Sequence, residues 1–161
     1  MAYTPNPHQR SGGQGRGPGM PMPAPSEVLK QFKQSLAAGA SFGDEQIMGL
    51  AETLAADLEG GFKNESGRTQ VRKVYGEVRA LLEKGKGGFD AIRPELRLIQ
   101  AHVAYAVGRG TITPQFKEFA DEAVKRLIAA SQKEELDRFV KFFEALYAHF
   151  YYFSKCGRKE G

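Results

Sequence analysis

From Ser26 to the C-terminus, apolar residues recur every three to four positions, the spacing that places them on one face of an α-helix. The clearest run comprises Val71, Val74, Tyr75, Val78, Leu81 and Leu82. Alternating runs rich in β-branched residues, which are typical of strands, are missing from the sequence. The pattern therefore predicts an all-α fold, a single compact bundle of about five to six helices.

Glycines, prolines and capping residues divide this region into segments. The first four expected helices cover residues 26–38, 41–59, 66–84, and 94 to 108 or 110. The fifth is expected to start at Pro114, with Thr113 as its cap, and the sixth to start at residue 131. Residues 41–44 and 131–134 match the capping-box pattern, so we expect each of them to open its helix. The fifth and sixth helices are expected to form a core hairpin.

The last predicted helix is unusually aromatic. Eight of the 17 aromatic residues of the chain lie within residues 139–153. Most fall on one helical face, but Phe142, His149 and Phe153 fall to one side of it. Such a wide apolar arc fits either a central helix of the bundle or a helix that a partner covers, and both interpretations remain open.

The first 25 residues differ from the rest of the chain. They hold six of the eight prolines, five glycines and no acidic residue. This composition offers too little apolar surface to offset chain entropy, so it predicts a disordered tail ahead of one helical domain at residues 26–161. Arg10 and Arg16 faintly resemble an RNA-binding Arg-Gly tail, but a flexible leader is the favoured interpretation.

Signals of catalysis are weak. The single cysteine excludes an internal disulfide and any multi-cysteine zinc site, and the three histidines are far apart in sequence. No phosphate-binding loop or Gly-x-Ser-x-Gly motif is present. We therefore expect no enzyme activity, no metal and no cofactor. The absence of a long apolar run or a signal-peptide pattern predicts a cytoplasmic protein without a membrane span.

Positive charge is concentrated in the middle of the sequence. Residues 63–109 contain ten Lys and Arg against five Asp and Glu, whereas residues 26–62 contain two against six. The whole chain carries a formal charge of only +4. The segregation favours a nucleic-acid partner for the basic centre, although a merely solvated charged surface gives the same count.

Two helical stripes within this basic centre form a candidate binding surface. Arg68, Arg72 and Arg79 lie within about 40° of one another on the predicted helix 66–84. On the next helix, Leu98, His102, Tyr105 and Arg109 form a second stripe. Basic groups interleaved with rings suit a nucleic-acid strand. The alternative is that the rings fill a packing layer while the arginines pair with Glu77, Glu83 and Glu95.

Three segments resemble motifs of one protein family. Residues 69–75, TQVRKVY, resemble a (T/S)-Q-(I/V)-R-K motif, residues 104–109, AYAVGR, resemble an AYaxxR motif, and residues 139–145 resemble an F-x-x-FFEA run. The family is the small subunit of type III-A CRISPR effector complexes, the Csm complexes, and the resemblance covers roughly residues 45–155. His149 stands where a tyrosine is expected.

This resemblance implies a non-catalytic all-α subunit that stacks in several copies along guide RNA and its paired target RNA, beside backbone and large subunits. On this basis we expect phosphate contacts from five cations: Arg68, Arg72, Lys73, Arg79 and Arg109. Gln70 is expected to be a hydrogen-bonding neighbour, and His102 with Tyr105 a stacking or ribose contact. The acidic residues 44–59 are expected to meet the basic centre of a second copy.

Two other functions remain open at this point. One is a helical scaffold that contacts only protein and uses its arginines in ion pairs. The other is a helix-turn-helix DNA-binding regulator, which needs a short turn between two helices. The glycine-rich loops at residues 85–88 and 108–113 fit that turn poorly.

Overall fold

The computed structural model describes residues 26–156, and this part of the chain consists of helices joined by turns and short loops, with no strand. The predicted all-α class is therefore confirmed. The predicted disordered tail at residues 1–25 lies outside the described residues, as do the last five residues of the predicted domain.

Six helices have ten or more residues among those described. The elements in chain order are α2 (Glu27–Ala37), α3 (Glu45–Met48), α4 (Ala51–Gly60), α5 (Glu65–Lys84), the 3₁₀ turns η1 (Gly85–Gly87) and η2 (Phe89–Ala91), α6 (Arg93–Gly108), α7 (Pro114–Ala130) and α8 (Lys133–Cys156). Ser26, Asn64 and Thr113 cap α2, α5 and α7 with side-chain oxygens that accept a backbone N–H of the first turn.

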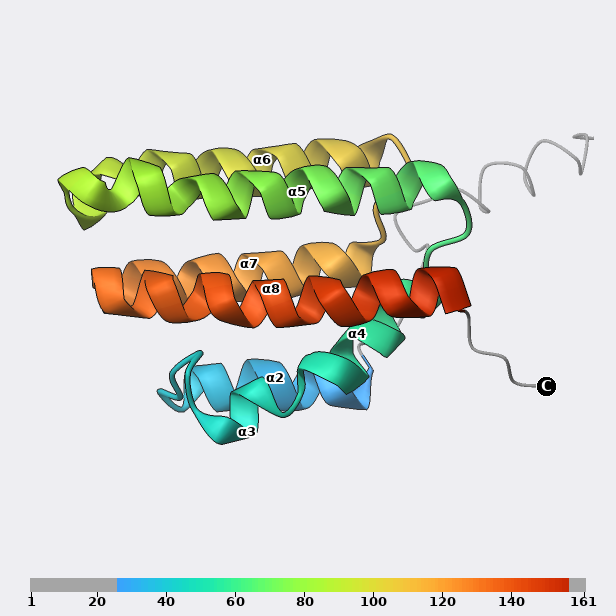
Figure 1. The fold of residues 1–161 in the computed structure, drawn as a ribbon, viewed down its shortest axis with the longest axis horizontal. Coiled ribbons are helices and arrows are strands. Elements are labelled where there is room, and N and C mark those ends of the chain that lie inside the picture. Colours follow the sequence, from blue (N-terminus) through green and yellow to red (C-terminus); the bar gives the residue numbers. More distant parts are fainter. Residues whose placement is uncertain (1–25, 157–161) are drawn as a thin grey trace, which may run out of the picture.

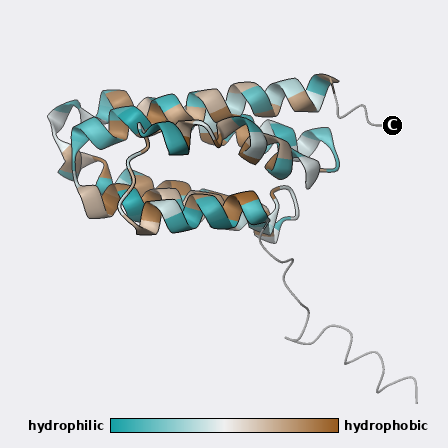
Figure 2. Ribbon diagram, turned by 90° about the horizontal axis from the view of Figure 1, so that it is seen from below, coloured by the Kyte–Doolittle hydropathy of each residue, from teal (hydrophilic) through white to brown (hydrophobic). Residues whose placement is uncertain are grey.

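The helices form three tiers (Figure 1). α5 and α6 lie side by side in one outer tier, α7 and α8 form the middle tier, and α2 lies with α3 and α4 in the other outer tier. Hydrophobic and hydrophilic residues alternate in patches along the helices (Figure 2), as the spacing predicts for helices with one buried face. The middle tier is covered on both sides.

α8 is the helix around which the tiers assemble. It packs against α4, α5 and α7. Phe142 is fully buried and stacks on Phe32 of α2 at a centroid distance of 5.6 Å. Phe143 faces the opposite tier, where its ring lies 6.0 Å from that of Tyr75 on α5. The wide aromatic arc therefore serves a central helix as far as Phe150, the last buried aromatic residue of α8.

The prediction of one helix over residues 41–59 is wrong, because the structure divides this segment into α3 and α4. At Leu50 the backbone N–H bonds the carbonyl oxygen of Ile47, three residues back, at 2.9 Å. This tighter turn, which follows Gly49, lets Ile47 and Leu54 both reach the core. Only half of the expected capping box forms: Asp44 accepts the Ser41 N–H at 2.9 Å, and Asp44 is the residue that precedes α3.

The capping box expected at residues 131–134 does not form. Ser131 has a left-handed backbone (φ 53°) and ends α7, with its hydroxyl donating to the Ile128 carbonyl at 2.8 Å. Only Ser131 and Gln132 separate α7 from α8. The antiparallel hairpin requires an abrupt reversal there, and this requirement overrides the local capping pattern.

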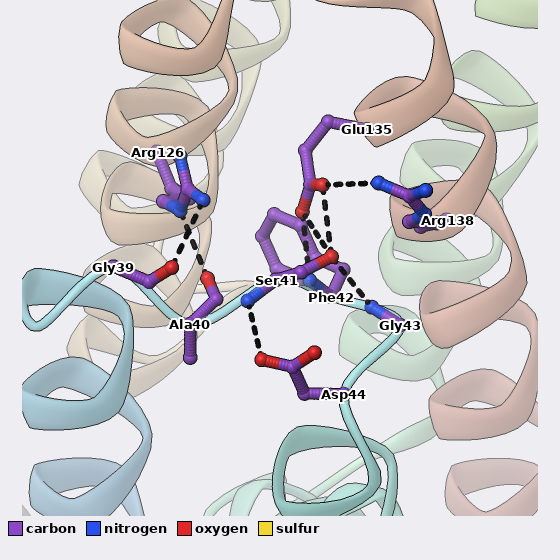
Figure 3. A network of polar contacts seen from close by, with 9 residues as sticks. All are labelled: Gly39, Ala40, Ser41, Phe42, Gly43, Asp44, Arg126, Glu135 and Arg138. Atoms are coloured by element: carbon purple, nitrogen blue, oxygen red, sulfur yellow. Dashed lines mark hydrogen bonds and ion pairs between the residues drawn. The ribbon is translucent and has the colours of Figure 1, made fainter.

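A buried carboxylate connects the loop after α2 to the start of α8 (Figure 3). Glu135 is 3% exposed, and its carboxylate accepts the Phe42 N–H at 2.7 Å and the Ser41 hydroxyl at 2.9 Å. Arg138 donates to the same carboxylate at 3.2 Å. From α7, Arg126 donates to the carbonyl oxygen of Ala40 at 2.9 Å. Both helices of the middle tier therefore hold this loop.

We expect Glu135→Ala to lower the free energy of unfolding by about 2–3 kcal/mol, because the buried Phe42 N–H and the Ser41 hydroxyl lose a charged acceptor. Urea denaturation measures the change. The exposed neighbour Glu134 provides the control Glu134→Ala, expected within about 0.5 kcal/mol of wild type. Equal stability of the two variants would contradict the role of the Glu135 network.

Two glycines of α5 allow a second test of the packing. A Cβ on Gly67 would collide with the Thr111 carbonyl oxygen and lie 2.6 Å from the Phe62 ring, whereas a Cβ on Gly76 would have no neighbour within 4 Å. We expect Gly67→Ala to destabilise by about 1–3 kcal/mol and Gly76→Ala to stabilise by up to about 1 kcal/mol. Thermal unfolding compares both variants with wild type. A change in stability of the same sign in both would contradict this packing.

Candidate nucleic-acid interface

The predicted site residues divide between two surfaces of the molecule. Arg72 and Lys73 are consecutive on α5, so their side chains leave the helix about 100° apart. The buried residues Val71, Val74 and Val78 lie on the opposite side of the helix, between the direction of Tyr75 and Arg79 and that of Gln70 and Glu77. We call the two regions the α5–α6 surface (Gln70, Lys73, Glu77, His102, Tyr105 and Arg109) and the α5–α8 surface (Arg72, Tyr75, Arg79, Tyr147, Tyr151 and Lys155).

The α5–α6 surface collects most of the predicted polar and aromatic contacts. Gln70, Lys73, His102 and Tyr105 line a hollow of about 200 Å³ together with Glu77. Tyr105 is 66% exposed, although it is a large aromatic residue. The Arg109 guanidinium lies 5.8 Å from the centre of the Tyr105 ring, so it joins this surface from the end of α6. A ring and two cations are thus presented together to solvent.

The α5–α8 surface is a row of rings flanked by cations. Tyr75 and Tyr147 stack at 4.7 Å, and the Arg79 guanidinium lies 5.9 Å from the Tyr75 ring. Lys155 lies 5.6 Å from the ring of Tyr151, which is 52% exposed. This row lies where α5 runs beside α8 (Figure 1).

Arg72 adds an exposed charge to that row. It lines a small hollow with Tyr147 and Tyr151. Burial raises the pKa of the Tyr147 hydroxyl, and the nearby Arg72 charge opposes this rise. The guanidinium therefore acts electrostatically on the partly buried ring beside it.

Arg68 differs from the other predicted cations. Its guanidinium binds the Glu59 carboxylate at 2.6 Å, donates to the Phe62 carbonyl at 3.4 Å and lies 3.9 Å from Glu65. The Glu59 side chain is only 8% exposed. The pair joins the end of α4 to the start of α5, so this arginine has a structural task.

The acids that could have neutralised the arginines bind other groups. Glu77 bonds His102 at 2.8 Å, Glu83 pairs with Lys86 at 2.7 Å, and Glu95 pairs with Lys84 at 2.9 Å. Within residues 26–156, Arg72, Lys73, Arg79 and Arg109 form no ion pair. Four of the five cations assigned to phosphate are therefore free to bind an anion.

Sequence reasoning missed several members of these surfaces. Tyr147, Tyr151 and Lys155 were part of the aromatic helix, but nothing in the sequence placed them beside Arg72. Glu77 lies within one turn of Lys73 on α5, so its position was readable from the helical spacing, although its bond to His102 was not.

Neither a metal site nor a membrane span is found in the part of the chain that the structure describes. No group of three or more His, Cys, Asp or Glu residues is placed to hold a metal ion there. No helix within residues 26–156 is both long and apolar enough to cross a membrane.

Comparison with known proteins yields one match. The family model described as Csm2 Type III-A matches residues 43–155, which is well over half of the chain. No curated protein and no solved structure matches. The matched region begins in the loop before α3 and ends one residue before the end of α8, so it includes both surfaces.

We expect Arg68→Ala to lower the free energy of unfolding by about 2 kcal/mol, because it leaves the buried Glu59 carboxylate without its cation. This value allows for the 24% exposure of the Arg68 side chain. Arg72→Ala, one turn later on α5, is the matched control and is expected within about 0.5 kcal/mol of wild type. Chemical denaturation measures both variants. An Arg68→Ala variant as stable as the control would contradict the structural role of Arg68.

Proposed function

Since the chain belongs to the Csm2 type III-A family and is the small subunit of a type III-A Csm complex, a CRISPR effector, we propose that it binds RNA within that complex. In this proposal, several copies stack along the guide RNA and its paired target RNA in antiviral defence. Each copy contacts phosphate and ribose without reading sequence, because base pairing with the guide supplies specificity.

One observation carries this proposal. The free cations Arg72, Lys73 and Arg109 are exposed beside exposed rings, while most neighbouring acids are paired elsewhere. A protein that used these arginines only for its own stability would pair them, as it pairs Arg68. Free guanidinium and ammonium groups suit phosphates, and a ring such as Tyr105 suits stacking on a base or ribose.

We assign the contacts accordingly. Phosphate contacts belong to Arg72, Lys73, Arg79 and Arg109, and Gln70 donates a neighbouring hydrogen bond. His102 and Tyr105 provide the ribose or stacking contact. The phosphate contact predicted for Arg68 is not retained, because its guanidinium already binds Glu59 and the Phe62 carbonyl.

The remaining roles follow from membership of the complex. We propose that the subunit is non-catalytic, that it acts in the cytoplasm, and that its protein partners are other copies of itself and the backbone and large subunits. Glu45, Glu52 and Asp57 of α3 and α4 are exposed and form no ion pair within the described residues. They offer a negative surface to the free cations of a second copy, in a head-to-tail contact.

The test is a titration of mixed-sequence single-stranded RNA of about 40 nucleotides by fluorescence anisotropy across a salt series. We compare wild type with Lys73→Ala/Arg109→Ala and Arg72→Ala/Arg79→Ala. The logarithm of the binding constant should fall linearly with the logarithm of salt concentration, and each variant should flatten the slope by about 0.7 per lost phosphate contact.

Lys125→Ala/Lys141→Ala is the charge-matched control, because both lysines are exposed on other helices and form no ion pair in the described region. It should leave the slope unchanged. Equal flattening by all three double variants would reduce the effect to net charge and overturn the assignment. If wild type binds no RNA at low salt, a scaffold that contacts only protein is favoured. If it binds duplex DNA more tightly than RNA, a DNA-binding regulator is favoured.

A further inference from the structure

A carboxylate–imidazole pair bridges α5 and α6 in the middle of the α5–α6 surface. The His102 Nδ1 atom lies 2.8 Å from Glu77 Oε2. The two residues line both the hollow of about 200 Å³ and a second one of about 80 Å³ further along the same helices. A strand lying along the groove between α5 and α6 would therefore pass directly over this pair.

The pair determines which nitrogen of His102 carries the proton. An ionised carboxylate only accepts hydrogen bonds, so Nδ1 must donate to Glu77. Glu77 Oε1 is buried and has no hydrogen-bond partner within the described residues, so the bond to His102 is the one that this part of the chain gives the carboxylate, whose side chain is 38% exposed. With Nδ1 as the donor, Nε2 of the neutral ring is an acceptor.

The Nε2 atom of the neutral ring differs from the other groups of this surface because it can only accept a hydrogen bond. Lys73 and Arg109 can only donate hydrogen bonds, whereas Gln70 and Tyr105 can both donate and accept. The free oxygen of Glu77 is closed off from solvent. The His102 side chain is 49% exposed, so its ring is accessible to a ligand.

The nucleic-acid backbone offers one matching group. Phosphate oxygens and the sugar ring oxygen accept hydrogen bonds, and only the ribose 2′-hydroxyl donates one. Every RNA nucleotide carries this hydroxyl and no DNA nucleotide does. A contact to it requires no particular base.

We propose that His102, oriented by Glu77, accepts a hydrogen bond from a ribose 2′-hydroxyl and thereby makes the α5–α6 surface selective for RNA over DNA. This inference rests on the proposed RNA-binding function and specifies its ligand. His102 is the contact residue, and Glu77 is a positioning residue that acts through the tautomer of the ring.

The experiment uses the full chain at low salt, in a mildly alkaline buffer. Three strands of one mixed sequence are titrated: RNA, DNA and 2′-fluoro RNA. The 2′-fluoro strand keeps an RNA-like sugar but cannot donate a hydrogen bond. One neutral hydrogen bond corresponds to about fivefold in affinity, so wild type should prefer RNA over both other strands by at least about this factor.

Variants then locate the preference. His102→Phe keeps a flat ring without nitrogens and should reduce the RNA preference to about one while leaving the salt dependence unchanged. Glu77→Ala removes the carboxylate that keeps the proton of His102 on Nδ1, so it should weaken the preference for RNA. The lost negative charge should at the same time tighten binding of all three strands. Glu83→Ala removes the same charge from α5 but should leave the preference intact, because Glu83 pairs with Lys86 and not with His102.

The outcomes separate this inference from the proposed function. Equal affinity of wild type for RNA and 2′-fluoro RNA overturns the inference and leaves RNA binding standing. A preference that survives in His102→Phe overturns the assignment to His102. If wild type binds none of the strands, the proposed function fails and the inference fails with it.

Discussion

The burial of α8 on two sides is the constraint on which the remaining structure depends. Its aromatic residues cover too wide an arc for one neighbouring helix, so Phe142 faces α2 while Phe143 faces Tyr75 of α5. Two outer tiers are needed to remove this apolar area from water. Because α5 packs against α8 along one side and against α6 along the other, both candidate surfaces are consequences of that arrangement.

The charged residues divide into those that connect elements of the fold and those that remain available to bind a ligand. Arg68, Glu59 and Glu135 connect elements and are partly or fully buried. Arg72 and Lys73, on the same helix as Arg68, have no such partner within residues 26–156. The RNA binding that we propose needs both kinds, because cations that neutralise the protein's own acids cannot neutralise phosphates.

Most of the secondary structure could be predicted from local patterns, and the errors have a common cause. The caps at Ser26 and Thr113 depend only on neighbours in sequence, and both form at the predicted starts of their helices. The box at residues 131–134 fails because the α7–α8 hairpin needs a left-handed residue at Ser131. The box at residues 41–44 is incomplete because the Ser41 hydroxyl, which donates to Glu135 94 residues away, accepts the Gly43 N–H and not that of Asp44. Local signals fail where a distant element competes for the same atoms.

The sequence by itself determined the helical class, the approximate helices, the basic centre and the motifs that indicate a type III-A small subunit. These depend on residue spacing and charge, which are properties of short segments. Only the tertiary structure decided which cations are paired, that the proposed binding residues lie on two surfaces, and that Glu77 contacts His102. Helical spacing gives the direction of a side chain from its own axis, but contacts between helices depend on how those axes pack.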